Sequence, residues 1–264
     1  MAADLPKRRW PFNRLNPRGL DGTSARPRGG CGLRIVYLNS GRMPSKDANS
    51  VQIAKMCEAF ARNGHDLTLV ARAGDGGAAR LFEAYGVDPV FTVEMLQSRG
   101  FRGLRTLTFL HRARGVARRR PRPDLIYARD PLMLAVVADL GRPMIYESHY
   151  MPPAGTFRFR LLDWLLRRQN FARLVCTTRA TREDFRRHFP WLAGDKAMVA
   201  ANGAAEPRFD GVELPDWPGR SGHLQVGFVG RPYPGKGIET IAAAAAGPPH
   251  VDFHLLGRAP EGPP

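Results

Sequence analysis

A glycine-bearing loop at residues 230–237 places two cations close to backbone amides. Its sequence is Gly-Arg-Pro-Tyr-Pro-Gly-Lys-Gly, it follows an apolar run at residues 223–229, and a helical pattern begins at its end. Amides at a helix N-terminus donate to anions, and Arg231 and Lys236 add two positive charges, so the loop suits a diphosphate. A glycine-rich turn with two solvated bases explains the same residues. The loop is not a Walker A motif, because Gly237 stands where that motif has Ser or Thr.

A single histidine, His149, follows the expected strand at residues 144–147. Side chains beyond the carboxyl ends of parallel strands meet ligands, and there a histidine can donate or accept a hydrogen bond or act as acid or base. A structural histidine is the alternative. We expect Glu147 to be buried or partnered at the strand end. We do not expect it to pair with His149, on the rule that neighbouring residues along a strand point to opposite faces.

The cysteines give no sign of a metal centre. Cys31, Cys57 and Cys176 form no CxxC pair and have no histidine at ligand spacing. Neither a disulfide framework nor a zinc site is indicated, and a reducing cytoplasm fits this pattern. We expect no metal ion and no resident cofactor.

Strand and helix patterns alternate along the chain, which favours an α/β fold with a Rossmann-like, doubly wound parallel sheet. The first strand is expected to end in a loop at Asn39-Ser40-Gly41, and Arg129 follows the strand at residues 125–128. The other expected strands are residues 67–70, 89–93, 144–147, 174–177 and 198–200, and the expected helices are residues 49–63, 103–119, 131–140, 157–170 and 181–188.

Composition divides the chain into four parts. Residues 1–32 are predicted to be a basic, disordered arm, residues 33–203 the first domain, and residues 204–222 a Pro/Gly-rich linker. Residues 223–264 hold a strand, a helix and a strand, the first βαβ of a second Rossmann-like domain. We expect this second domain to be incomplete, because a doubly wound half needs on the order of 100 further residues to enclose a core.

The chain is strongly basic, with 40 Lys+Arg against 24 Asp+Glu in 264 residues and a net charge of +16. No apolar run approaches the length of a membrane span. The excess of arginine indicates either a polyanion-binding surface or a compositional bias. Residues 99–122 carry nine arginines and no acid, and as a helix they would set Leu104, Leu107, Leu110 and Val116 on an apolar stripe. Such a helix suits an anionic membrane surface or is simply solvated; few aromatic residues are interleaved, so we do not expect nucleic acid.

Read in order, these features resemble the retaining glycosyltransferases of family four, which have the GT-B fold. The carriers are the strand and loop at residues 35–41, the helix at 50–65, Pro-Asp-Leu-Ile-Tyr-Ala-Arg at 123–129, Asp195-Lys196, Asn202-Gly203 with Phe209, and residues 229–237. The resemblance covers residues 33–257.

The resemblance implies transfer of a hexosyl group from a nucleotide-sugar, bound between two domains, to a glycan or lipid-linked acceptor on the N-domain side. Arg231 and Lys236, with Gly230, match the group that holds the donor diphosphate. Gly41 matches the glycine loop that approaches it from the first domain, and His149 matches the histidine that faces the transferred sugar. The candidates on the acceptor side of the cleft are Arg129, Tyr150 and Asn202.

The sequence departs from the family pattern in one respect, and this leaves alternative functions open. No Glu-x7-Glu pair, which binds donor sugar and ribose in the family, occurs in the sequence. We therefore expect a C-terminally truncated enzyme that is either inactive alone or completed by another chain. We expect it in the cytoplasm, peripheral to the inner face of the membrane. The alternatives are a noncatalytic module that binds a polyanion or membrane surface, and a sugar-nucleotide epimerase with the same fold.

Overall fold

The structure, a computed structural model, describes residues 32–97, 101–204, 218–230, 232, 235–247 and 249–257. The chain divides into two compact units between Gly203 and Ala204. Residues 1–31 of the predicted arm at residues 1–32, and most of the predicted linker, lie outside the described residues. Each unit is described by itself.

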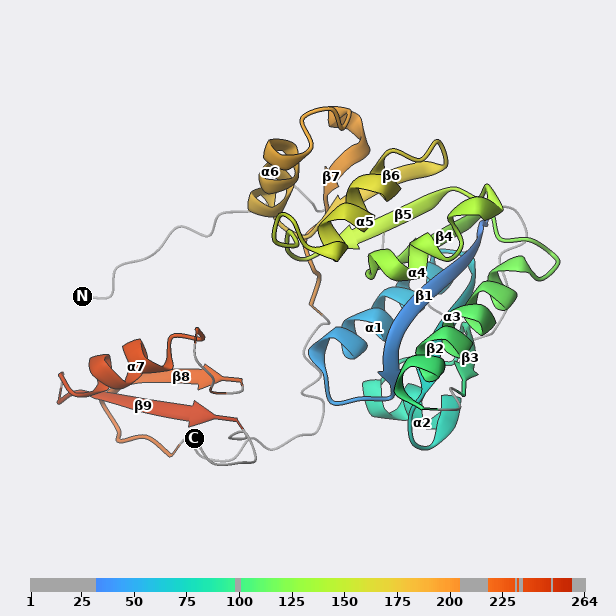
Figure 1. The fold of residues 1–264 in the computed structure, drawn as a ribbon. Helices are drawn as coiled ribbons and strands as arrows, with labels where there is room; N and C mark the ends of the chain where they lie inside the picture. Colours follow the sequence, from blue (N-terminus) through green and yellow to red (C-terminus); the bar gives the residue numbers. More distant parts are fainter. Residues whose placement is uncertain are drawn as a thin grey trace. The chain divides into compact units, whose positions relative to one another are not determined.

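The first unit is built on a seven-stranded parallel sheet with the order β3-β2-β1-β4-β5-β6-β7 (Figure 1). The chain runs outward from β1 to β3 and then returns to place β4 on the other side of β1. The strands are β1 Arg34–Met43, β2 Asp66–Ala73, β3 Thr92–Leu96, β4 Leu125–Ala128, β5 Met144–Ser148, β6 Phe171–Cys176 and β7 Ala197–Val199. This order confirms the predicted doubly wound sheet. The topological switch point, where the strand order reverses, lies between the neighbouring strands β1 and β4.

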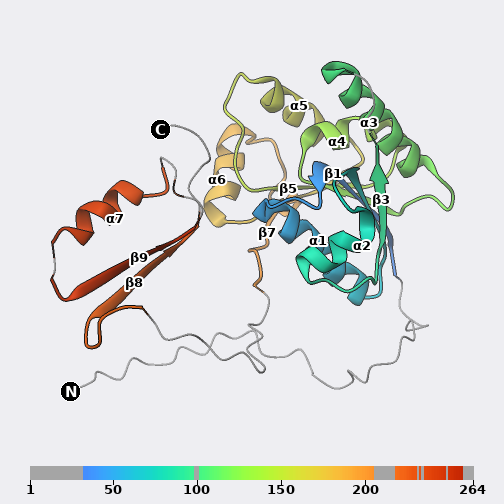
Figure 2. The same cartoon turned by 90° about the horizontal axis from the view of Figure 1, so that it is seen from below.

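Helices cover both faces of this sheet, as Figure 2 shows for α1 and α2 on one side and α3, α4 and α5 on the other. Alternate residues of β1 enter the two cores: Ile35 and Tyr37 pack with α1 and α2, and Val36 and Leu38 pack with α3 to α6. The helices are α1 Ala48–Arg62, α2 Gly77–Tyr85, α3 Arg102–Arg118, α4 Pro131–Ala135, α5 Phe157–Leu166 and α6 Arg179–His188, with short 3₁₀ helices η1 Ala138–Leu140 and η2 Gly194–Lys196.

Several elements of the first unit differ from the sequence prediction. Strand β3 lies at Thr92–Leu96 rather than at residues 89–93, and the helix expected at residues 131–140 is divided into α4 and η1. Helix α2 was not expected. It begins at Gly76 and Gly77, which both have positive φ, and it buries only Leu81 and Tyr85. Strand β1 does not end in a loop at Gly41 but continues to Met43, with a shift of register against β2 between Leu38 and Arg42. An irregularity of this kind lets turn-forming residues lie within a strand.

The apolar stripe predicted for α3 is also wrong in part. The helix buries Phe109, Ala113, Val116 and Ala117, while Leu107 is 65% exposed and Leu104 is exposed as well. The buried face consists of residues 109, 113, 116 and 117. Two of these are alanines, which fit against the sheet because they are small and add little hydrophobicity to the pattern. Leu104 and Leu107 therefore lie on the outward side, whereas Leu110 is partly buried and packs against the core.

The second unit has the expected strand–helix–strand order. Strands β8 Leu224–Val229 and β9 Val251–Leu256 pair in parallel, and α7 Ile238–Ala245 connects them. Among its described residues none is buried, and the side chain of Val229 is 81% exposed. A two-stranded sheet with a single helix offers little area for a core.

Candidate functional site

A cavity of about 520 Å³ opens at the switch point, beyond the carboxyl ends of β1, β4 and β5. Open α/β sheets bind ligands at this place. Four of the residues predicted from the sequence line it: Arg129, His149, Tyr150 and Asn202. The other polar side chains of the lining are those of Asn39, Ser40, Asn49, Gln52, Asp130, Tyr146, Glu147 and Arg158.

The carboxylate of Glu147 lies against the ring of His149, with 2.8 Å between Oε1 and Nε2. The expectation that these two residues do not pair is therefore wrong. Side chains alternate with a period of two along an extended chain, so residues 147 and 149 point to the same face and only Ser148 points away. Glu147 is buried, as expected.

Arg129, directly after β4, joins this pair to α1. Its Nε lies 3.5 Å from Oε1 of Glu147, its Nη1 donates to Oε1 of Gln52 over 3.1 Å, and its Nη2 contacts Nε2 of His149. Gln52 in turn donates to the side-chain oxygen of Asn202. Side chains from β5, the β4 end, α1 and the end of the first unit thus form one connected network.

The second oxygen of Glu147 is held from below the cavity. The hydroxyl of Tyr127 in β4 donates to Oε2 over 2.6 Å, within the core. Burial raises the pKa of Tyr127 well above its usual range, and the neighbouring Glu147 carboxylate adds to the shift. Tyr127 therefore stays protonated and acts as a donor, which orients the carboxylate whose other oxygen faces His149.

One nitrogen of His149 serves two neighbours. If Nε2 carries a proton, it donates to Glu147; if it does not, it accepts from Arg129. It cannot do both at once, so the tautomer of the ring selects its partner. This arrangement gives the imidazole at the cavity wall two defined hydrogen-bonding states.

The wall formed by β1 is fixed by Asp130. One oxygen of this carboxylate accepts from the hydroxyl of Ser40 over 2.7 Å, and the other accepts from the amide of Leu132 and caps α4. Gly41 does not line the cavity; its amide donates to Oδ1 of Asn39 over 3.0 Å, and the cavity is lined by Asn39 and Ser40 instead.

Tyr150 forms part of the outer wall. Its side chain is exposed, and its backbone carbonyl accepts from the hydroxyl of Ser148 over 2.8 Å. The Tyr150 ring is thus accessible to a ligand while its backbone is fixed.

The predicted diphosphate loop belongs to the second unit. Gly230 follows β8, and its amide donates to the carbonyl of Leu256 over 2.9 Å. Lys236 stands between Gly235 and Gly237, both with positive φ, just before α7. Arg231 lies outside the described residues.

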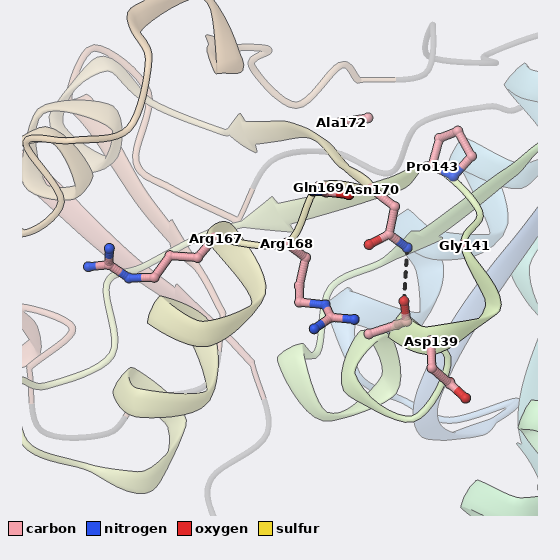
Figure 3. A pocket seen from close by; sticks show the side chains of 9 residues that line it. Asp139, Gly141, Pro143, Arg167, Arg168, Gln169, Asn170 and Ala172 are labelled. Carbon is pink, nitrogen blue, oxygen red and sulfur yellow. Dashed lines mark hydrogen bonds between the residues drawn. The ribbon is translucent and has the colours of Figure 1, made fainter.

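A second cavity, of about 750 Å³, lies at the opposite edge of the first sheet, before β5 and β6 (Figure 3). The side chain of Asn170 points to the neighbouring backbone there and donates to the carbonyls of Ala138 and Arg142 over 3.0 and 2.9 Å. Arg167 pairs with Asp163. These polar groups hold the loops together, so the switch-point cavity is the better candidate for chemistry.

Neither a metal centre nor a membrane-spanning helix is found in the described part of the chain. It contains no group of three His, Cys, Asp or Glu side chains placed to hold a metal ion. No helix in it has the length and apolar character needed to cross a bilayer.

The residues of the cavity that the sequence analysis missed are polar side chains of ordinary type. Gln52 sits on the first helix without any motif, and Asn39 and Ser40 lie in the extension of β1. The position of Glu147 could have been predicted, because it stands two residues from His149 on an extended segment. The position of Asp130 could have been predicted too, because an Asp before Pro131 is typical of a helix start.

Comparison with known proteins places the chain in a family. The model of Glycosyltransferase Family 4 matches residues 50–205, more than half of the chain. No curated protein matches the sequence.

Solved structures share the fold. The chain is similar to Anabaena HepE in complex with UDP (21% identity, TM-score 0.61, 87% of this chain and 62% of that chain covered). It is also similar to the catalytic domain of Arabidopsis thaliana starch synthase IV bound to ADP and acarbose (14%, TM-score 0.59, 87% and 69% covered). A third is the lipopolysaccharide outer core galactosyltransferase WaaB (11%, TM-score 0.61, 87% and 62% covered).

The chain thus spans 62% of the length of HepE and of WaaB. The match of the family model over most of the first unit, together with the Rossmann-like sheet, gives the assignment. The chain belongs to Glycosyltransferase Family 4.

Proposed function

We propose that the protein takes part in hexosyl transfer from a nucleotide-sugar to a glycan or lipid-linked acceptor, with retention of configuration. The observation that carries this proposal is the network of Glu147, His149 and Arg129 at the switch-point cavity of a family-four domain. We carry retention over from the resemblance to the retaining glycosyltransferases of family four.

The first unit is the acceptor side in this proposal, and His149 faces the transferred sugar. Its imidazole hydrogen-bonds sugar hydroxyls, and Glu147 and Arg129 fix the ring in place. Arg129, Tyr150 and Asn202 contact the acceptor or the sugar from the remaining walls. Polar side chains at fixed positions are suited to this, since a sugar offers many hydroxyl groups and little apolar surface.

The second unit is the donor side in this proposal, where Gly230, Arg231 and Lys236 hold the diphosphate. Departure of a nucleoside diphosphate develops negative charge, and fixed cations stabilise that charge more in the transition state than in the ground state. Structures of HepE with UDP and UDP-glucose, and of starch synthase IV with ADP, support a nucleotide-sugar as donor.

Calorimetric titration of the whole chain with UDP-, GDP- and ADP-sugars tests the donor assignment. We expect saturable binding of one nucleotide class and its loss in Lys236→Gln. Arg80→Gln, which removes one exposed charge from α2, is the matched control and should bind as the wild type does. Absence of saturable binding to every donor would contradict the proposal. NMR of the product anomer then tests retention.

The outward side of α3 supports a location at an anionic membrane surface, which we propose is the cytoplasmic face. Phe101 is 78% exposed, and Leu104 and Leu107 are exposed beside it on an arginine-rich helix. Exposed apolar side chains with neighbouring cations are typical of helices that lie in an anionic lipid surface. A noncatalytic membrane-binding module is the second candidate function on this observation.

Vesicle binding separates these possibilities from a solvated helix. We expect the protein to bind phosphatidylglycerol vesicles, with an affinity that falls with salt and falls further in Leu104→Ser/Leu107→Ser. If this variant binds as the wild type does, the apolar side of α3 does not enter the bilayer. Membrane binding without any sugar transfer would favour the noncatalytic module.

A further inference from the structure

We propose that the first unit carries a phosphate-binding pocket at the edge of the sheet opposite the switch-point cavity. The pocket has a volume of about 320 Å³ and lies where α3 ends and the loops before β4 and β5 begin. Four arginines line it, Arg114, Arg118, Arg122 and Arg142, together with Asp139. This site goes beyond glycosyl transfer and depends on none of its residues.

The charge of the pocket is unbalanced. Its one carboxylate, Asp139, is bound by Arg114 through both terminal nitrogens, at 2.7 Å for Nη2 to Oδ2. That hydrogen bonding lowers the pKa of Asp139, to which the nearby charge of Arg118 also contributes. In the part of the chain that the structure describes, no carboxylate lies within ion-pair distance of Arg118, Arg122 or Arg142. Three guanidinium groups thus share one pocket without a counter-charge of their own.

Arg142 has an orphaned donor. Its Nε is buried and has no hydrogen-bond partner among the described residues. A buried donor without an acceptor is costly, and an anion that draws the guanidinium group of Arg142 toward the pocket would supply the missing acceptor. This observation points to a ligand independently of the charge.

Hydrogen bonds within the protein hold the walls of the pocket in place before any ligand binds. Arg114 donates to the carbonyl of Val136 over 2.7 Å, and the backbone carbonyl of Arg142 accepts from Asn170 over 2.9 Å. The guanidinium fork of Arg114 and the loop that carries Arg142 are therefore held before binding. Such preorganisation lowers the entropy that binding costs.

A phosphate group matches these features. Planar guanidinium groups bind phosphate oxygens by paired, charge-assisted hydrogen bonds, and arginine stays charged at any working pH. The pocket has room for a phosphate and part of the molecule that carries it. A soluble phosphate compound and a phospholipid headgroup offer the same chemistry, so the experiment must separate these two sources.

The test uses the whole chain with two probes, inorganic phosphate and vesicles of phosphatidylcholine with or without phosphatidylglycerol. Binding is followed by NMR of the arginine Nε–H signals, assigned by substitution, and by vesicle co-sedimentation. The variants are Arg118→Gln and Arg142→Gln. Arg80→Gln, an equal loss of charge on the other face of the sheet, is the control, and circular dichroism confirms that each variant is folded.

For a phosphate pocket, we expect the Nε–H signal of Arg142 to move on saturation, with binding weakened about tenfold by each pocket variant and unchanged by the control. Saturation with inorganic phosphate identifies a soluble compound as sufficient. Binding to phosphatidylglycerol vesicles alone, with the same dependence on Arg118 and Arg142, identifies a lipid headgroup. Absence of binding to both probes, or an equal loss in the control, would overturn the proposal.

Discussion

Glu147 and His149 stand on the same side of the chain at the end of β5, with 2.8 Å between the carboxylate Oε1 and the imidazole Nε2. The other carboxylate oxygen accepts from Tyr127 in the core, so the pair is fixed from below and open to the cavity above. A ring held in this way keeps its place at the cavity wall. This property is what the proposed role of His149 requires.

The hydroxyl of Tyr127 should contribute to stability, whereas that of Tyr37 should not. Both rings are buried and lie 5.0 Å apart, but only Tyr127 has a hydrogen-bond partner; the Tyr37 hydroxyl has none among the described residues. Tyr127→Phe is expected to lower the free energy of unfolding by about 2 kcal/mol, and Tyr37→Phe to change it by less than about 0.5 kcal/mol. Urea unfolding of both variants checks this. Equal losses would mean that the Tyr127–Glu147 bond adds nothing.

Loss of the buried charge of Glu147 should be more costly than loss of an exposed one. Glu147 is 3% exposed and faces Arg129, which Glu147→Gln leaves without its buried counter-charge. We expect a loss of about 3 kcal/mol in the free energy of unfolding. Glu94→Gln breaks the exposed pair of Glu94 with Arg119 and should cost less than about 1 kcal/mol.

The same urea titration measures both variants. A loss from Glu147→Gln no larger than that from Glu94→Gln would contradict the account of a fixed, buried carboxylate below the cavity.

Much of the fold could be predicted from the sequence because its strands are buried on both faces and are read as short apolar runs between turns. The missed helix α2 starts in glycines and buries only two side chains, so its pattern is weak. The extension of β1 beyond Leu38 runs through Asn39-Ser40-Gly41, residues that normally form turns. Pairing with β2 resumes at Arg42 and Met43 beyond the shift of register, and this tertiary contact keeps the segment between the two paired stretches extended.

The candidate site was predicted only in part, for a physical reason. Strand ends can be located from the sequence, and this places Arg129 and His149 at the same edge of the sheet. Partners from elsewhere in the chain cannot be located in this way, since the contact of Gln52 with Asn202 joins residues far apart in sequence. The pairing of Glu147 with His149 was readable from a spacing of two and was missed.

Stability should fall at alkaline pH because the fold buries tyrosines. Burial raises the pKa of Tyr146 to about 12 and raises that of Tyr127 as well. Above pH of about 10 the unfolded chain releases these protons while the folded chain keeps them, so the free energy of unfolding should fall as pH rises. Each tyrosine contributes up to about 1.4 kcal/mol per pH unit. Urea unfolding across this range measures the slope, which Tyr146→Phe should reduce; a flat profile would be inconsistent with buried phenols.

The second unit should open more readily than the first. Its described residues include none that is buried, whereas β1, β4 and β5 of the first unit lie in two hydrophobic cores. Amide hydrogen exchange is expected to be faster in β8, α7 and β9 than in those three strands. Equal protection in both units would show that residues of the second unit are covered in solution.

The most direct measurement is sugar transfer by the whole chain from a panel of nucleotide-sugars to glycan and lipid-linked acceptors. Transfer is monitored through the nucleoside diphosphate that it releases. The account predicts transfer from one donor class. In His149→Ala the rate is expected to fall by a factor of about 100 or more, because the ring at the cavity wall is lost. Arg80→Gln should retain the wild-type rate. Wild-type transfer by His149→Ala, or no transfer from any donor, would contradict the account.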